Sequence, residues 1–227
     1  MARGRTFKSA LTATIALAAL VPSAAPAALQ VTQFSLTPST LQASGHPSVY
    51  LAAGFLGADT NSGIKDIVLH LPPGLRVKSK IADRCSSKLL IRNDCPTPSK
   101  IGQVKVSGSA FGTPATITRD VNAVRPLGGE KLRLAAIALP GIPVTLPVTA
   151  RADGGLDISI TSIPQIGGAI VAQLDRIEIR IKSKIGKRAL LTNPATCVPA
   201  LTTFQLGLRD PAVAPVAAAS VFTPTGC

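Results

Sequence analysis

Alternation of apolar and polar side chains with a period of two is the feature that most constrains this chain. In the segment Arg176–Lys182, isoleucine at every second position alternates with arginine, glutamate or lysine. Successive side chains of a β-strand point to opposite faces, so this pattern predicts a strand with one buried and one solvated face. Similar runs predict strands over residues 48–55, 66–71, 101–106, 131–139, 142–149, 156–160, 201–208 and 219–223.

Frequent turn signals separate these runs and indicate an all-β fold. They are Asn61-Ser62-Gly63, Gly128-Gly129, Asp153-Gly154-Gly155 and Gly167-Gly168. Only residues 79–90, where alternation is poor, suit a short helix. Many short strands with frequent turns are typical of a sandwich or a barrel. We expect an immunoglobulin-like β-sandwich or two packed β-lobes, although the Cys…Trp…Cys signature is absent because the chain contains no tryptophan.

The domain organisation follows from where the alternation weakens, between Ala110 and Asp120. This predicts an N-terminal lobe at 28–115 and a C-terminal lobe at 116–227, with one continuous sandwich over 28–227 as the alternative. Pro143 and Pro147 on one face of their run predict an edge or bulged strand, because proline cannot donate to a ladder. The Ala/Pro/Val-rich segment 211–220 is expected to be an extended connector.

Residues 1–27 have the pattern of a secretory signal peptide. Three basic residues precede the uncharged run Ala10–Val21, and Ala25-Pro26-Ala27 supplies the small-residue pattern that signal peptidase reads. We therefore expect cleavage between Ala27 and Ala28 and a secreted or cell-surface protein. A membrane anchor is the alternative, but the run is shorter than the roughly 20 residues that span a bilayer.

The charge of the chain favours anionic partners without specifying one. Removing the three basic residues of the leader from the formal net charge of +13 leaves +10. Because single-strand recognition needs aromatic stacking platforms and aromatic residues make up 3% of the chain, specific nucleic-acid binding is not expected. The candidate contact face for an anionic envelope polymer or a lipid headgroup consists of Arg176, Arg180, Lys182 and Lys184. A solvated surface is the alternative.

Four cysteines in an exported chain predict two disulfides. Three pairings are possible, and closeness in sequence favours Cys85 with Cys95 and Cys197 with Cys227. A zinc site is disfavoured because no C-x-x-C spacing occurs. An unpaired Cys227 that bonds to another molecule is a further alternative.

Catalytic motifs are absent, so we expect a protein that is not an enzyme and predict no cofactor or metal. There is no P-loop, no G-x-G-x-x-G and no H-E-x-x-H. A hydrolase remains an alternative if His46 or His70 meets a serine and an acid such as Asp66 or Asp153 in space. Asp153 and Asp157 could hold a calcium ion, but two carboxylates supply few of the oxygen ligands that such a site needs.

Several short motifs also occur together in a recognisable order. They are Gln42–Pro47, Leu71–Leu75, Cys95-Pro96 followed by Ser99 and Ile101-Gly102, and Leu191–Pro194 followed by Cys197. In this order they resemble secreted actinobacterial surface proteins of uncharacterised function, over about residues 30–200. The resemblance implies export, a β-rich architecture and a link between Cys85 and Cys95, and it implies no catalytic residue.

These observations favour an exported, non-enzymatic β-rich protein with a structural or adhesive role at the bacterial envelope. Two other functions stay open. One is the extracellular hydrolase with a spatially assembled site. The other is a carrier of a small apolar ligand, which requires an interior cavity of a few hundred Å³ or more.

Overall fold

The structure, a computed structural model, describes residues 29–57, 64–78, 84–110, 113–139, 141–161, 163, 172–209, 211 and 214–227. The predicted signal peptide lies outside the described residues. The long strands are β1 (Gln30–Pro38), β2 (Val49–Leu56), β3 (Ile64–Leu71), β5 (Lys100–Ala110), β6 (Thr113–Val124), β7 (Glu130–Leu139), β8 (Ile142–Ala150), β9 (Leu156–Ile160), β10 (Ala172–Ile181), β14 (Ala200–Leu208) and β15 (Val216–Phe222). The short elements are β4 (Arg76–Val77), α1 (Ser87–Ile91), a 3₁₀ turn (Thr97–Ser99), β11 (Lys184–Ile185), β12 (Arg188–Ala189) and β13 (Leu191–Thr192).

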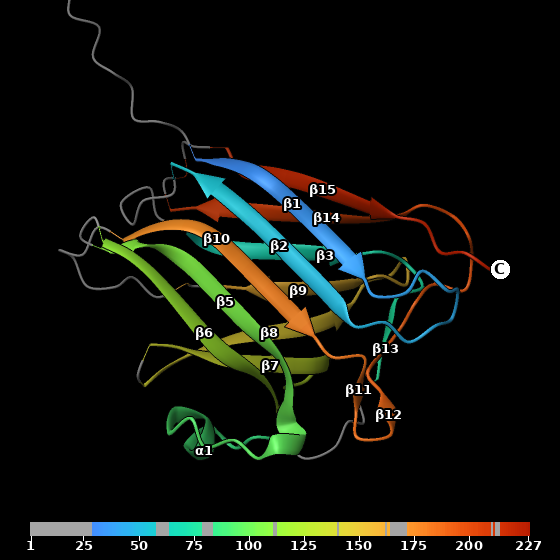
Figure 1. Cartoon of the computed structure of the whole chain (residues 1–227), viewed down its shortest axis with the longest axis horizontal. Coiled ribbons are helices and arrows are strands. Elements are labelled where there is room, and N and C mark those ends of the chain that lie inside the picture. Colours follow the sequence, from blue (N-terminus) through green and yellow to red (C-terminus); the bar gives the residue numbers. More distant parts are fainter. Residues whose placement is uncertain are drawn as a thin grey trace, which may run out of the picture.

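All the long strands belong to one 11-stranded antiparallel sheet that forms a nearly closed barrel (Figure 1). The order of its strands is β1-β2-β10-β5-β6-β7-β8-β9-β3-β14-β15. Because neighbours alternate in direction and the number of strands is odd, the first and last strands, β1 and β15, run in the same direction.

The seam between β1 and β15 is held by a few isolated hydrogen bonds. The Leu36 N–H donates to the Ser220 hydroxyl over 3.0 Å. Beyond the strand ends, the Ala43 N–H donates to the Thr225 carbonyl over 2.8 Å, and the Thr225 N–H donates to the Leu41 carbonyl over 2.7 Å. In the described residues the sheet order places no ladder between β1 and β15, so the barrel is nearly, not fully, closed.

The prediction of an immunoglobulin-like sandwich or of two packed lobes is wrong. A sandwich packs two separate sheets face to face, whereas this chain curls one sheet on itself. Both predicted segments, 28–115 and 116–227, supply strands to that sheet, and their boundary falls inside β6. The alternation pattern did not separate these folds, because a sandwich strand and a barrel strand each bury one face.

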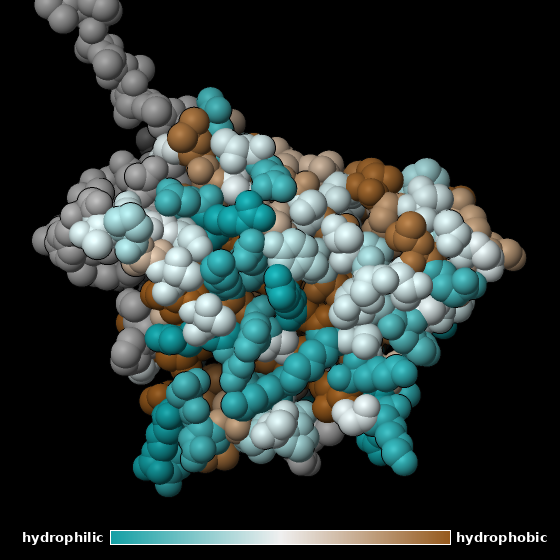
Figure 2. Space-filling model, viewed as in Figure 1, coloured by the Kyte–Doolittle hydropathy of each residue, from teal (hydrophilic) through white to brown (hydrophobic). Residues whose placement is uncertain are grey.

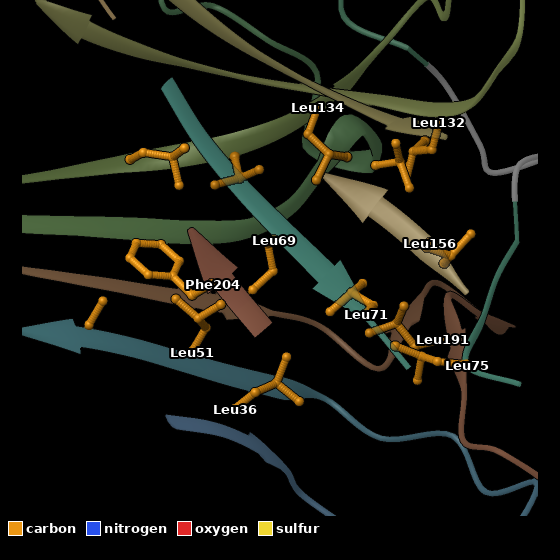
Figure 3. Packing of buried hydrophobic residues seen from close by; sticks show 14 of the residues in the cluster. Leu36, Leu51, Leu69, Leu71, Leu75, Leu132, Leu134, Leu156, Leu191 and Phe204 are labelled. Atoms are coloured by element: carbon orange, nitrogen blue, oxygen red, sulfur yellow. The ribbon is translucent and has the colours of Figure 1, made fainter. Parts of the chain in front are cut away.

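The core lies inside the barrel, where the apolar rows of the strands meet. Leu69 of β3, Leu134 of β7 and Phe204 of β14 are all at least nine-tenths buried, and Figure 3 shows them facing a common interior. Phe204 stacks on Phe34 with ring centroids 5.2 Å apart and lies 6.1 Å from Phe55. The aromatic side chains therefore fill the side of the barrel formed by β1, β2 and β14.

The two ends of the barrel differ. We call the end at which β3 and β10 finish the closed end, because loops pack across it. Pro47, Pro72, Leu75, Leu190 and Leu191 are buried there, and β13 pairs with β4 in a small separate ladder. We call the opposite end, at which β6 and β8 begin, the open end.

Helix α1 packs on the outside of β7 and is bracketed by the first disulfide. Ser86 caps its start by accepting the Leu89 N–H, and Leu90 is buried against Cys85, Cys95 and the outward side chains Ala135 and Ile137. The helix begins later than the segment 79–90 suggested, and residues 79–83 of that segment lie outside the described residues. The last strand, β15, also takes in residues 216–220 of the segment expected to be a connector.

The disulfides are Cys85–Cys95 and Cys197–Cys227, which is the pairing that spacing favours. Two bridges of this kind indicate an oxidising environment. The second one ties the end of the chain to the loop before β14.

Candidate binding cavity

A cavity of about 500 Å³ occupies the interior of the barrel. Its wall is almost entirely aliphatic and comes mainly from β2, β3, β5, β6, β7, β8, β9 and β10, with Leu36 of β1 and Phe204 of β14. Representative lining residues are Leu51, Ile67, Val104, Leu146, Ile158 and Ile179. A volume of this size falls within the roughly 300–1,000 Å³ of small-molecule sites.

The cavity exists because aliphatic side chains do not fill a barrel of 11 strands. Eight strands already leave an interior just wide enough for side chains or one small ligand. Here the three packed phenylalanines lie toward one side. The facing walls carry Val104, Ile177 and Ile179 on one side, and Leu146 and Ile158 on the other. All five point inward, yet they are only half-buried, so the space between the walls stays unfilled.

The sheet is split on both sides of the β7–β8 hairpin at the open end. β6 pairs with β7 only from Asn122 to Val124, although β6 pairs with β5 from Thr113 to Asn122. Likewise β8 pairs with β9 only from Val148 to Ala150. In Figure 1, β6 and β7 converge near α1 and diverge toward the left of the view. The inward residue Ala115 is exposed as a result.

The splits explain how β8 tolerates its prolines. Pro143 and Pro147 point outward and pair with Ile137 and Arg133 of β7. Both lie in the half of β8 that has no partner on the β9 side. A missing N–H costs little at such an unpaired edge, so this half behaves as the edge strand that the prolines suggest.

Two charged side chains line the cavity among the described residues, and both are arginines. Arg119 lies on the inward row of β6, opposite Val104 of β5. Arg209 follows β14, five strands away in the sheet order, and its guanidinium donates to the Ile163 carbonyl over 2.6 Å. Sequence reasoning missed Arg119. The signal that could have found it is a lone arginine in the alternating row Ala115, Ile117, Val121.

The predicted polyanion face lies on the outside of the barrel and is partly neutralised. Glu178 accepts hydrogen bonds from the Tyr50 hydroxyl over 2.7 Å and from Arg176 Nε over 2.8 Å. These bonds hold the pKa of Glu178 below its ordinary value. Arg180 lies over the Tyr50 ring at 5.3 Å from its centroid. Figure 2 shows hydrophilic side chains gathered over this face.

The remaining members of the predicted face extend toward the closed end. Lys182 and Lys184 are exposed, and the Lys182 ammonium donates to the Lys100 carbonyl over 2.9 Å. Arg176 and Arg180 thus lie on the outer face of β10, with Glu178 between them, and Lys182 directly follows the strand.

The two histidines lie apart from each other in the fold. His46 Nδ1 lies 3.1 Å from the Leu191 carbonyl and 3.2 Å from the Thr192 hydroxyl at the closed end. His70 lies on the outer face of β3, and its Nδ1 is 2.7 Å from Asp157 Oδ1. Within the described residues, neither imidazole is hydrogen-bonded to a serine or to Asp66 or Asp153. The hydrolase stays a prediction without an assembled site.

Asp153 and Asp157 form ion pairs with Arg151. Arg151 Nη2 lies 2.8 Å from Asp153 Oδ2, and Arg151 Nη1 lies 3.0 Å from Asp157 Oδ1. The guanidinium and the Gly155 N–H hold the pKa of Asp153 below its ordinary value. Over the part of the chain that the structure describes, no cluster of three or more metal-binding side chains occurs.

Two of the motifs behind the family resemblance, Gln42–Pro47 and Leu191–Pro194, meet at the closed end. Asn193 is fully buried, and its Nδ2 donates to the carbonyls of Thr40 and Gln42 over 2.8 and 3.0 Å. The Asn193 N–H donates to the Gly45 carbonyl, and the Ser44 N–H donates to the Pro194 carbonyl. These hydrogen bonds join the loop after β1 to residues 193 and 194. Their role is to hold the two loops together.

Comparisons with protein-family models, with curated proteins and with solved structures find no match. The resemblance to secreted actinobacterial surface proteins therefore stays a prediction. None of the helices in the described segments has the length and apolar character needed to cross a bilayer.

Proposed function

We propose that this protein binds and carries a small apolar molecule inside its barrel, outside the cytoplasm. The observation that carries the proposal is the cavity of about 500 Å³ with an aliphatic wall. The half-buried state of inward residues such as Val104, Ile158 and Ile179 means that the empty cavity leaves apolar surface exposed to solvent. A ligand that covers this surface gains about 25 cal/mol per Å² of apolar area removed from water.

The predicted leader and the two disulfides support the location. Exported proteins keep bridges such as Cys85–Cys95, which reducing compartments would open. We therefore place the carrier in the secreted or cell-surface fraction.

Displacement of a neutral fluorophore tests the cavity. The probe is N-phenyl-1-naphthylamine, which fluoresces in apolar surroundings, and the competitors are straight-chain alcohols of increasing length. Each buried methylene contributes about 0.8 kcal/mol, so affinity should rise about fourfold per carbon until the cavity is full. Affinity that is independent of chain length would contradict the proposal.

A matched pair of variants locates the site. Val144→Phe adds a ring to the cavity wall, whereas Val221→Phe makes the same change on the exposed outer face of β15. We expect Val144→Phe to weaken probe binding at least tenfold and Val221→Phe to leave it unchanged. Circular dichroism confirms that both variants are folded. Equal binding by the two folded variants places the probe outside the cavity.

We keep the structural or adhesive role as a second proposal, because three basic residues of the outer face are exposed. In the described part of the chain, Arg180, Lys182 and Lys184 make no ion pair with a carboxylate. The triple glutamine variant should lose salt-sensitive binding to teichoic acid or heparin at low salt. Wild-type protein that binds neither polymer at low salt would reject this role.

A further inference from the structure

We propose that the ligand of the cavity is an anionic amphiphile, with its alkyl chain inside the barrel and its carboxylate on Arg119. This inference rests on the proposed function and names the class of ligand. It follows from three properties of Arg119: its position in the inward row of β6, the lack of an acidic partner among the described residues, and its closeness to the split in the sheet.

Arg119 occupies a position that the strand pattern reserves for apolar residues. It lies in the inward row with Ala115, Ile117 and Val121, and it lines the cavity. The residue opposite on β5 is Val104. Arg119 is half-buried, and a guanidinium that loses part of its hydration beside apolar surface gains from a partner that compensates it. The retained guanidinium therefore points to a partner of opposite charge.

The protein itself supplies no such partner in the part that the structure describes. The guanidinium of Arg119 donates only to the neighbouring Thr118 carbonyl, over 3.2 Å, and no acidic residue is among those that line the cavity. By contrast, Arg133, Arg151 and Arg176 each form an ion pair with a nearby carboxylate. As far as the described residues go, the cavity thus has an aliphatic wall and a positive charge without a counter-ion.

The position of Arg119 suits the head of an amphiphile. It lies three residues from Asn122, where pairing between β6 and β7 ends. The head can therefore remain in contact with water at the split, while the chain extends toward the leucines of the closed end. Arg209, at the same cavity, adds a second positive charge. A guanidinium binds a carboxylate in a bidentate manner, which fixes the head.

Two competitors of equal length test the inference in the fluorophore displacement assay. They are dodecanoate, which carries the charge, and dodecanol, which does not, both below the concentrations at which they form micelles. We expect the wild-type protein to bind dodecanoate at least tenfold more tightly. Arg119→Gln should remove that preference while changing the affinity for dodecanol less than twofold. Arg119→Lys should restore part of the preference.

Arg180→Gln is the matched control, since Arg180 lies on the outer face and takes no part in the cavity. It should keep the preference for dodecanoate. A wild-type protein without the preference, or an Arg119→Gln variant that keeps it, overturns the inference but leaves the carrier function standing. Failure of both competitors to displace the probe overturns the carrier function itself. Retained dodecanol binding shows that Arg119→Gln is folded.

Discussion

Asn193 links the loops of the closed end through its side chain and its backbone. Its amide bridges two carbonyls of the loop that follows β1, those of Thr40 and Gln42. Asn193→Ala leaves both carbonyls without that donor in a buried site. We expect a loss of about 2–3 kcal/mol in the free energy of unfolding, measured with urea. The exposed outer-face substitution Gln205→Ala should cost less than about 0.5 kcal/mol. Similar losses for the two variants would contradict this role.

The outer network around Glu178 makes stability depend on pH. Hydrogen bonds from Tyr50 and Arg176 lower the pKa of Glu178 in the folded state. A carboxyl with a lowered pKa contributes stability above its unfolded-state pKa, and the contribution disappears as the pH falls through the folded-state value. We expect Glu178→Gln to flatten the fall in unfolding free energy below about pH 5. An unchanged pH profile would show that the network contributes nothing.

At the scale of the strand, β5 and β10 approach so closely that only glycine fits at one position. A Cβ on Gly102 would lie 2.2 Å from the Arg180 carbonyl oxygen of β10. The backbone must shift to admit it, so Gly102→Ala should lower the unfolding free energy by about 1–3 kcal/mol. Gly128→Ala is the control, because its Cβ would meet no atom within 4 Å. Thermal unfolding of the two variants distinguishes them, and equal midpoints would contradict the close approach.

Local alternation predicted strands where the inward row is apolar without interruption. The segment Arg176–Lys182 gave both the strand β10 and its inward face. The pattern failed for β6, because Arg119 interrupts its inward row and Ala115 is exposed beside the split. Within the segment 110–120, where the weak pattern suggested a boundary, β6 begins at Thr113 and lines the cavity. The element with the most functional interest was therefore the least regular in sequence.

At the scale of the whole molecule, the disulfide Cys197–Cys227 holds the segment that follows β15. Thr225 of this segment is hydrogen-bonded across the barrel seam to Leu41 and Ala43. Cys197–Cys227 closes a loop of sequence separation 30, and Cys85–Cys95 closes one of 10. In the loop-entropy description these contribute about 3.6 and about 2.7 kcal/mol. The double variant Cys197→Ser/Cys227→Ser should therefore lose more unfolding free energy in urea than Cys85→Ser/Cys95→Ser. The reverse order would show that α1 and its bridge matter more than the seam.

Barrel closure and the cavity could not be read from the sequence. Closure depends on pairs far apart in the chain, such as β10 inserted between β2 and β5, and on the Leu36–Ser220 bond at the seam. Period-two patterns say which side chains are covered, but the same pattern serves a flat, folded or curled sheet. The size of the cavity depends on the number of strands in the barrel. That number is known only when every strand has been assigned its two neighbours.

Because β1 and β15 point in the same direction, the barrel has a defined response to mechanical force. β1 starts at the open end and β15 finishes at the closed end, so tension applied to the two termini pulls along the strands. The hydrogen bonds between β1 and β2, from Gln30 to Pro38, then carry the load together instead of tearing one after another. A barrel held in this way resists stretching along its strands.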